Sequence, residues 1–443
     1  MGFLARFKNK HFLVFTGNAF TSAVGLFTGA LLAHMLSLGD AGIWWVFISF
    51  VTLCEAARYG LLATATVKFY AGTTEERART VLGSIWVLAL ALTAIILLLN
   101  LGIYAIFPHT GNVATDLYIK WVGLTYLSSL PADVAFWRLQ AEEKYGAYFW
   151  FRMVNSLSTI IAFVVLALLH KLTLENALLY NFLTNCLSSL IGLLCNMTGL
   201  RMIVHQTKEC VLELFHYGKY TFLTTSFSVL IYQSDNWIIN LMLGSESVAV
   251  YNVATRLLPI IDLPLRSFVT TGTSEMAIQY NQNNMHQVGY IFKKYTGMLT
   301  LAFVPVICAA ILFGNIAILL YGGHKYDGTI ASSAFSIFMM IAILYPFDRF
   351  NGVILDITNR AKINSTKVAV MLAVKILAAI LGILIFKNIY GIVFGIFLST
   401  LAGVAFGHYY LRKQITYTIT EILQLGFSET KSFVRNQLKR NKP

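Results

Sequence analysis

Ionisable side chains interrupt several long apolar runs of this 443-residue sequence. A charged side chain at the centre of a bilayer costs about 2.5–3.5 kcal/mol on insertion scales, so such residues usually mark a transport pathway or an ion pair. Arginine binds phosphate through its bidentate fork, and lysine binds it as a point charge. The cations in these runs that are candidates for binding an anionic ligand are Arg58, Arg256, Arg266, Arg349 and Lys375.

Carboxylates lie within the same runs and are candidates for holding a coupling ion. They are Glu55, Asp133, Asp235, Asp262 and Asp348. The i, i+3 spacing predicts that Glu55 pairs with Arg58 on one helix. The i, i+4 spacing predicts the same for Asp262 and Arg266. A positive cavity therefore requires that the acids be paired or face elsewhere.

Lys375 stands near the middle of an otherwise charge-free run. One interpretation is a salt bridge between helices, for example with Asp348. The other is a cationic lining that meets an anionic ligand. The sequence leaves both interpretations open.

Two prolines predict a hinge in the run that carries Arg256 and Asp262. Pro259 and Pro264 each remove a backbone hydrogen bond from the helix that contains them. Broken helices that carry charge are common in transporters. We therefore expect bending at Pro259 or Pro264.

The motifs of common enzymes are absent from the sequence. It has no zinc-binding HExxH, no P-loop, no Gly-x-Ser-x-Gly elbow and no paired-glycine dinucleotide fingerprint. Its five cysteines form no pair motif. We expect no enzymatic activity, no cofactor and no metal.

The composition explains which elements must position these residues. Hydrophobic residues make up 57% of the chain and charged residues 12%, whereas a soluble domain carries about 25% charged residues. The mean hydropathy is +0.68. The net charge of +13 would suggest nucleic acid on a soluble chain, but here the basic residues lie mainly between apolar runs. The chain is predicted to be a polytopic membrane protein that binds no nucleic acid.

Long unbroken apolar runs predict membrane-spanning helices, because strands of a membrane barrel would alternate over about 10 residues. Residues 295–324 and 388–411 contain no Asp, Glu, Lys or Arg. Twelve spans are predicted at 11–33, 42–62, 81–107, 113–138, 149–169, 174–198, 217–243, 248–275, 294–320, 331–358, 365–386 and 389–411.

The distribution of Lys and Arg predicts the orientation of these spans. One set of connections, together with the tail, holds twenty-four such residues, and the opposite set holds three. The two sets alternate with every predicted crossing, so both termini are expected to be cytoplasmic.

The two halves of the chain resemble each other. A Leu-Gly turn at Leu38-Gly39 recurs at Leu243-Gly244, followed in both places by an aromatic residue that enters the next span. A repeated six-span unit is typical of transporter folds. We therefore expect an N-terminal six-helix lobe at 1–205, a C-terminal six-helix lobe at 206–412 and a basic cytoplasmic tail at 413–443. The tail is expected to form an amphipathic helix on the anionic inner leaflet, with Lys431, Arg435 and Lys439 on its basic side, or to be solvated.

Four segments together resemble the polysaccharide and O-antigen (Wzx-type) flippases of the multidrug/oligosaccharidyl-lipid/polysaccharide (MOP) exporter superfamily. The spacing of the twelve spans is also similar to theirs. The segments are Leu38-Gly39 with Gly42-Ile43, the loop Leu139-Gln140-Ala141-Glu142-Glu143-Lys144-Tyr145, the stretch from Asp235 to Leu257, and Thr358-Asn359-Arg360-Ala361-Lys362-Ile363-Asn364.

The resemblance implies an all-helical membrane protein of two pseudo-symmetric six-helix bundles that form a V. It implies that an undecaprenyl-pyrophosphate-linked oligosaccharide is moved by alternating access across the bacterial cytoplasmic membrane. Polysaccharide polymerase and other assembly proteins are then expected partners. Arg256 corresponds to the family by its Tyr-x-x-Ala-x-Arg segment, whereas Arg266 and Lys375 correspond by inference.

Two other functions remain open. A cation-coupled multidrug exporter of the same superfamily would use unpaired acids such as Asp133, Asp235 and Asp348 to hold its ion. A non-transporting membrane component of a glycan-assembly complex is the other. A membrane polymerase is disfavoured, because such enzymes typically carry a large outer loop and the predicted outer loops are short.

Overall fold

The computed structural model describes residues 10–107 and 111–440, which form helices and short connections without a strand. Eight of the described helices are long and apolar enough to cross a membrane. The predicted all-helical, multi-pass architecture is therefore confirmed. The chain divides into an N-terminal unit, up to Asn240, and a C-terminal unit from Leu241 onward.

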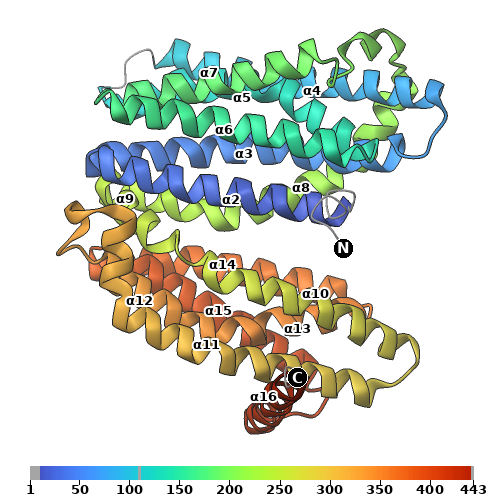
Figure 1. The fold of residues 1–443 in the computed structure, drawn as a ribbon, viewed down its shortest axis with the longest axis vertical. Coiled ribbons are helices and arrows are strands. Elements are labelled where there is room, and N and C mark those ends of the chain that lie inside the picture. Colours follow the sequence, from blue (N-terminus) through green and yellow to red (C-terminus); the bar gives the residue numbers. More distant parts are fainter. Residues whose placement is uncertain (1–9, 108–110, 441–443) are drawn as a thin grey trace. The chain divides into compact units, whose positions relative to one another are not determined.

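The N-terminal unit contains one helix for each of the first seven predicted spans (Figure 1). Polar residues begin several of them: the Ser37 hydroxyl accepts from the Asp40 N–H at 3.1 Å, and Thr74 and Asn112 cap the next two helices in the same way. The helices are α2 (Lys10–Met35), α3 (Leu38–Tyr70), α4 (Glu75–Ile106), α5 (Val113–Ala141), α6 (Tyr145–Leu168), α7 (Leu174–Leu194) and α8 (Lys208–Leu243), with a short 3-10 turn η1 (Leu200–His205) before α8.

The core of this unit joins α3, α4, α5 and α8. Leu62, Ile85, Val134 and Leu214 are buried together in it. Helix α8 packs so closely on α3 that a Cβ added at Gly218 would lie 2.2 Å from the Leu61 carbonyl oxygen. This contact explains why α8 groups with the N-terminal unit. The predicted lobe boundary at 205/206, which rests on sequence repetition, stays a prediction.

The C-terminal unit contains two interrupted helices. The predicted span 248–275 is α9 (Ser245–Thr255) followed by α10 (Pro259–Asn281), and the predicted span 331–358 is α12 (Ala331–Ile341), η3 (Ala342–Leu344) and α13 (Tyr345–Ile357). The first break ends at Pro259, which fits the first turn of a helix because it needs no donor there. Pro264 lies inside α10 without a break. The remaining elements are α11 (Met285–Gly322), η2 (His324–Tyr326), α14 (Ala361–Phe386), α15 (Tyr390–Leu411) and α16 (Ile419–Arg440).

Glycines allow close helix contacts in this unit. A Cβ at Gly391 of α15 would lie 2.2 Å from the backbone N of Ile383 in α14. The turn predicted at Leu243-Gly244 is present, and Gly244 has φ +85° between α8 and α9. The matching Leu38-Gly39 instead forms the first turn of α3, since α2 ends at Met35.

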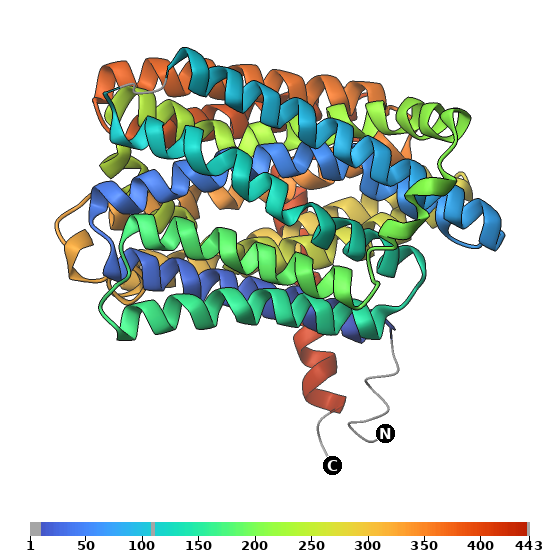
Figure 2. The same ribbon diagram turned by 90° about the horizontal axis from the view of Figure 1, so that it is seen from above.

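The predicted tail helix is present as α16, and it packs against α11. Ile422 is fully buried, and a Cβ at Gly297 of α11 would lie 2.1 Å from the Ile422 carbonyl oxygen. Helix α16 runs across the direction of α11, seen nearly end-on in Figure 1 and along its length in Figure 2. Of the predicted basic side chains, Lys431 is exposed, whereas the side chains of Arg435 and Lys439 lie outside those described.

Candidate functional site

A polar chamber of about 660 Å³ lies within the N-terminal unit. Five helices supply its walls: α2, α3, α5, α6 and α7. A polar cavity among apolar helices is unusual, because unsatisfied polar groups are costly away from water. Its lining residues are Thr21, Glu55, Tyr59, Ser129, Ala132, Asp133, Phe136, Trp137, Gln140, Tyr148, Arg152, Asn155, Ser156 and Asn185.

Arg58 lies behind the wall of this chamber and is fully buried. Its guanidinium donates to Asp133 Oδ2 at 2.5 Å, to Ser129 Oγ at 2.5 Å and to the Tyr126 carbonyl at 3.0 Å. It also lies 4.1 Å from the centroid of the Tyr126 ring. Arg58 therefore ties α3 to α5 and holds Asp133 in position.

The predicted pairing of Arg58 with Glu55 on the same helix is wrong: the ion pair is with Asp133 on α5. A guanidinium that points at the neighbouring helix gains several partners there, which an i, i+3 contact along α3 does not offer. Glu55 lines the chamber from α3, and Asp133 lines it from α5. The structure thus brings two of the proposed ion-coupling acids to one cavity.

Arg152 is a cation of the chamber that was not among the candidate site residues predicted from the sequence. It lies within α6, where Nε donates to Thr21 Oγ1 at 3.0 Å and Nη1 donates to the Tyr148 hydroxyl at 2.7 Å. Asn155 and Ser156 follow it on the chamber wall. The stripe of polar residues at positions 148, 152, 155 and 156 was the available signal, because these positions share a helix face.

The chamber presents hydrogen-bonding groups together with charges of both signs. Hydroxyl and amide groups such as those of Ser156, Asn155 and Asn185 both donate and accept hydrogen bonds. Arg152 supplies donors for a phosphate oxygen. Glu55 is a carboxylate that can hold a proton or a cation, whereas Asp133 is already paired with Arg58.

The remaining proposed residues lie on other elements. Asp235 is buried on α8, which the chain division assigns to the N-terminal unit. Arg256 follows the last residue of α9, at the break before Pro259. Arg349 is exposed on α13, and Lys375 is buried on α14.

The predicted pair between Asp262 and Arg266 is present. Arg266 Nη2 lies 2.6 Å from Asp262 Oδ2, one helical turn away on α10. The arginine side chain is 75% exposed.

Asp348 has an ion partner that the sequence did not suggest. Lys367 of α14 donates to its Oδ1 at 2.8 Å and to its backbone carbonyl at 3.0 Å. Lys367 is buried. It lies within the predicted span 365–386, and α14 begins four residues before that span, at Ala361.

Two family models match the sequence. Residues 7–271 match the family described as polysaccharide biosynthesis protein, and residues 221–386 match the family described as MatE. No curated protein matches the chain.

Solved structures share the fold. An inward-facing multidrug resistance MATE family transporter of the MOP superfamily is 17% identical, with a TM-score of 0.72 over 89% of this chain and 95% of that chain. Lipid II flippase MurJ, in an inward closed conformation, is 14% identical, with a TM-score of 0.71 over 97% of this chain and 93% of that chain. A MOP superfamily transporter from Pyrococcus furiosus is 16% identical, with a TM-score of 0.55 over 90% of this chain and 93% of that chain.

These similarities show that the chain shares its all-helical fold with the MATE transporter and with MurJ. Because the first family match spans more than half of the 443 residues, the chain belongs to the polysaccharide biosynthesis protein family.

Proposed function

We propose that this protein is a flippase for lipid-linked oligosaccharides. It moves undecaprenyl-pyrophosphate-linked glycan units from the cytoplasmic to the outer leaflet of the bacterial cytoplasmic membrane by alternating access. The observation that carries the proposal is the match of residues 7–271 to the polysaccharide biosynthesis family. The fold shared with lipid II flippase MurJ supports it.

The polar chamber supplies the contacts that the head of such a substrate needs. A glycan with two phosphates cannot cross hydrocarbon unaided, because its polar groups would lose their hydrogen bonds. In the proposal, Arg152 donates to phosphate, and Asn155, Asn185 and Gln140 bond to sugar hydroxyls. Arg58 contributes indirectly, by fixing Asp133 in the wall.

Cations of the C-terminal unit are proposed to take part in substrate binding. Arg256, Lys375, Arg266 and Arg349 are proposed to meet the pyrophosphate at stages of the transport cycle. The break between α9 and α10 puts Arg256 beside the hinge proposed at Pro259. Both termini are proposed to face the cytoplasm, where polysaccharide assembly proteins supply the substrate.

A null mutant tests the proposal directly. Loss of this chain is expected to abolish surface polysaccharide and to leave lipid-linked repeat units in the inner leaflet. They would be measured by lipid extraction and by protection from an external glycosidase. Normal surface glycan in the null mutant contradicts the proposal. So does absence of the accumulated lipid-linked unit, which would indicate a component of assembly rather than a transporter.

A cation-coupled multidrug exporter is the second candidate, and one observation favours it. Glu55 lines the chamber, so a carboxylate is placed where a proton or metal cation can be held, whereas Asp133 beside it is already paired with Arg58. Efflux of ethidium or norfloxacin from a pump-deficient host, lost in Glu55→Gln and Asp133→Asn, would support the exporter. Absence of efflux together with accumulation of lipid-linked glycan in the null mutant would support the flippase.

A further inference from the structure

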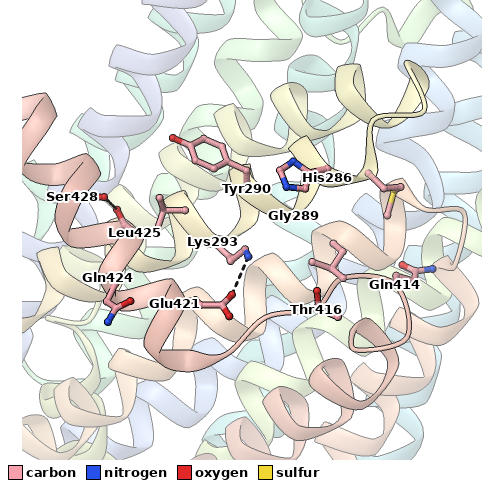
Figure 3. Close-up of a pocket in the computed structure, with 12 residues that line it drawn as sticks. His286, Gly289, Tyr290, Lys293, Gln414, Thr416, Glu421, Gln424, Leu425 and Ser428 are labelled. Atoms are coloured by element: carbon pink, nitrogen blue, oxygen red, sulfur yellow. Dashed lines mark hydrogen bonds and ion pairs between the residues drawn. The ribbon is translucent and has the colours of Figure 1, made fainter.

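A second cavity lies in the C-terminal unit, between the first turns of α11 and the tail helix α16 (Figure 3). Its volume is about 730 Å³. We call it the tail groove. Its lining includes Tyr290 and Lys293 of α11, Gln414 and Thr416 of the connection after α15, and Glu421 and Leu425 of α16.

The charge pattern of α11 indicates that the tail groove lies near one end of the membrane-spanning part of this helix. Residues 295–324 are free of charged side chains, and Lys293 and Lys294 directly precede them. At about 1.5 Å per residue, Lys293 is about 3 Å and Tyr290 about 8 Å from the start of this run. The polar layer of each leaflet is about 5–7 Å deep. Lys293 and Tyr290 are therefore at the depth of lipid headgroups.

Opposite charges face each other across the groove. Figure 3 shows Lys293 reaching from α11 toward Glu421 on α16, and Nζ lies 3.1 Å from Oε2. The side chains are 24% and 50% exposed. The hydrogen bond from Lys293 holds the pKa of Glu421 below its ordinary value, so the carboxylate is ionised at neutral pH.

Each member of this pair has capacity for another partner. An ammonium has three donors and a carboxylate has about four lone-pair positions. Among the described side chains, Lys293 uses one donor on Glu421. A phosphate can therefore approach Lys293, and an ammonium can approach Glu421, without separating the two residues.

A zwitterionic headgroup matches this arrangement better than an anionic one. A purely anionic headgroup bound at Lys293 would face the negative charge of Glu421. A phosphate joined to a primary ammonium would satisfy both residues. Met285, Ile415 and Leu425 supply apolar lining for the start of the lipid chains.

We propose that the tail groove binds the headgroup of an aminophospholipid of the inner leaflet, with its phosphate at Lys293 and its primary ammonium at Glu421. The lipid then contacts both α11 and α16 and contributes to the attachment of the tail helix. This site is separate from the polar chamber, and the proposal does not depend on the transported substrate.

The test measures which lipids the full-length chain retains. The purified protein is incorporated into bilayers with equal amounts of phosphatidylethanolamine, phosphatidylcholine and phosphatidylglycerol, extracted gently, and analysed by native mass spectrometry. We expect phosphatidylethanolamine to be retained about tenfold more than the other two lipids. Neither of those lipids can donate a charge-assisted hydrogen bond from an ammonium to Glu421. Phosphatidylcholine is the matched control, because its headgroup has the same charges but its ammonium has no N–H donor. Equal retention of phosphatidylethanolamine and phosphatidylcholine, or preferential retention of phosphatidylglycerol, overturns the proposal.

Variants of the lining residues test whether the retained lipid binds in the tail groove. Glu421→Gln is expected to remove the preference for phosphatidylethanolamine, and Lys293→Gln to reduce retention of all three lipids. Gln424→Trp fills the groove without altering either charge and is expected to exclude the lipid. Lys431→Gln, an exposed change on the same helix, is the control and is expected to retain the wild-type preference. A preference that persists in both Glu421→Gln and Gln424→Trp, in proteins with wild-type thermal midpoints, contradicts the site.

Discussion

The guanidinium of Arg58 lies 2.5 Å from the carboxylate of Asp133, and the two side chains differ sharply in access: 0% of the arginine and 29% of the aspartate is exposed. One end of the pair is closed within the helices, and the other opens on the polar chamber. The pair therefore fixes the carboxylate of Asp133 at the chamber surface. Arg58, which holds it, does not contact a molecule inside the chamber.

Removing the buried partner is expected to be costly. Arg58→Met leaves Asp133 without its cation, and such a change typically costs about 3–5 kcal/mol. The double variant Arg58→Met with Asp133→Leu is expected to lose less, because no charge is left uncompensated. Denaturant unfolding in detergent measures both.

An exposed ion pair provides the comparison. Arg79 pairs with Glu75 at the surface of α4, so Arg79→Met is expected to change the free energy of unfolding by less than about 1 kcal/mol. If Arg58→Met proves as mild as Arg79→Met, the buried pair does not hold α3 to α5.

Glu142 is expected to make stability depend on acidic pH. It accepts hydrogen bonds from the Tyr70 hydroxyl at 2.6 Å, from Arg138 Nε at 2.7 Å and from Lys144 Nζ at 2.7 Å. Burial alone would raise the pKa of Glu142, but these bonds outweigh it and hold the pKa below its ordinary value of 4.5. The stabilisation is therefore full above that ordinary value and is lost as the pH falls through the lower pKa of the folded state.

Thermal unfolding of the wild type and Glu142→Gln measures this contribution. The difference in midpoint is expected to be constant from about pH 7 to about pH 5 and to shrink toward about pH 3. A difference that grows on acidification would mean that the folded state raises the pKa of Glu142. Glu209→Gln, a surface change on α8, is the control.

Sequence reasoning predicted what depends on neighbours along one helix. Each of the twelve predicted spans coincides with a helix or an interrupted helix of the described residues, Pro259 marked a real break, and the i, i+4 rule identified the pair of Asp262 with Arg266. Each of these features is set by residues within about one helical turn or by the local hydropathy.

Contacts between helices could not be predicted in this way, because they join residues that are far apart in the sequence. Arg58 and Asp133 are 75 positions apart, and nothing in either helix indicates that α3 and α5 pack side by side. Lys367 and Arg152 fall inside the predicted spans 365–386 and 149–169, but neither was predicted as a site residue. Both lie inside helices, where Asp348 holds one and Thr21 and Tyr148 hold the other. Hydrogen-bonded partners of this kind offset part of the cost of burying a charge.

Gly297 is expected to control the attachment of α16. A methyl group at this position would lie 2.1 Å from the Ile422 carbonyl oxygen, so Gly297→Ala must displace the tail helix. Limited trypsin digestion is expected to remove the tail faster in this variant.

Gly102 of α4 is the matched control, because a Cβ there would meet nothing within 4 Å. Gly102→Ala should leave digestion unchanged and stabilise α4 by up to about 1 kcal/mol, through its better helix propensity. Equal digestion of the two variants would show that α16 does not depend on the contact at Gly297.

Arg152 is expected to be needed for transport and dispensable for folding. It lies at the chamber surface, bonded to Thr21 and Tyr148, which are neutral groups. Arg152→Ala therefore leaves no buried charge unpaired, and the thermal midpoint should stay close to that of the wild type. Loss of charge-assisted bonds to a phosphate is expected to lower the rate of surface glycan appearance by about 10- to 100-fold.

Two further variants test whether transport needs the charge of Arg152 alone or also the shape of its guanidinium group. Arg152→Lys keeps the charge but loses the fork, so it is expected to fall between alanine and wild type. Arg201→Ala removes an exposed cation of η1 and should have no effect. If Arg152→Ala, expressed at the wild-type level, supports full surface glycan in the null strain, the chamber does not bind the phosphate through this residue. Full transport in Arg152→Ala combined with loss in Lys375→Ala would place the phosphate contact in the C-terminal unit.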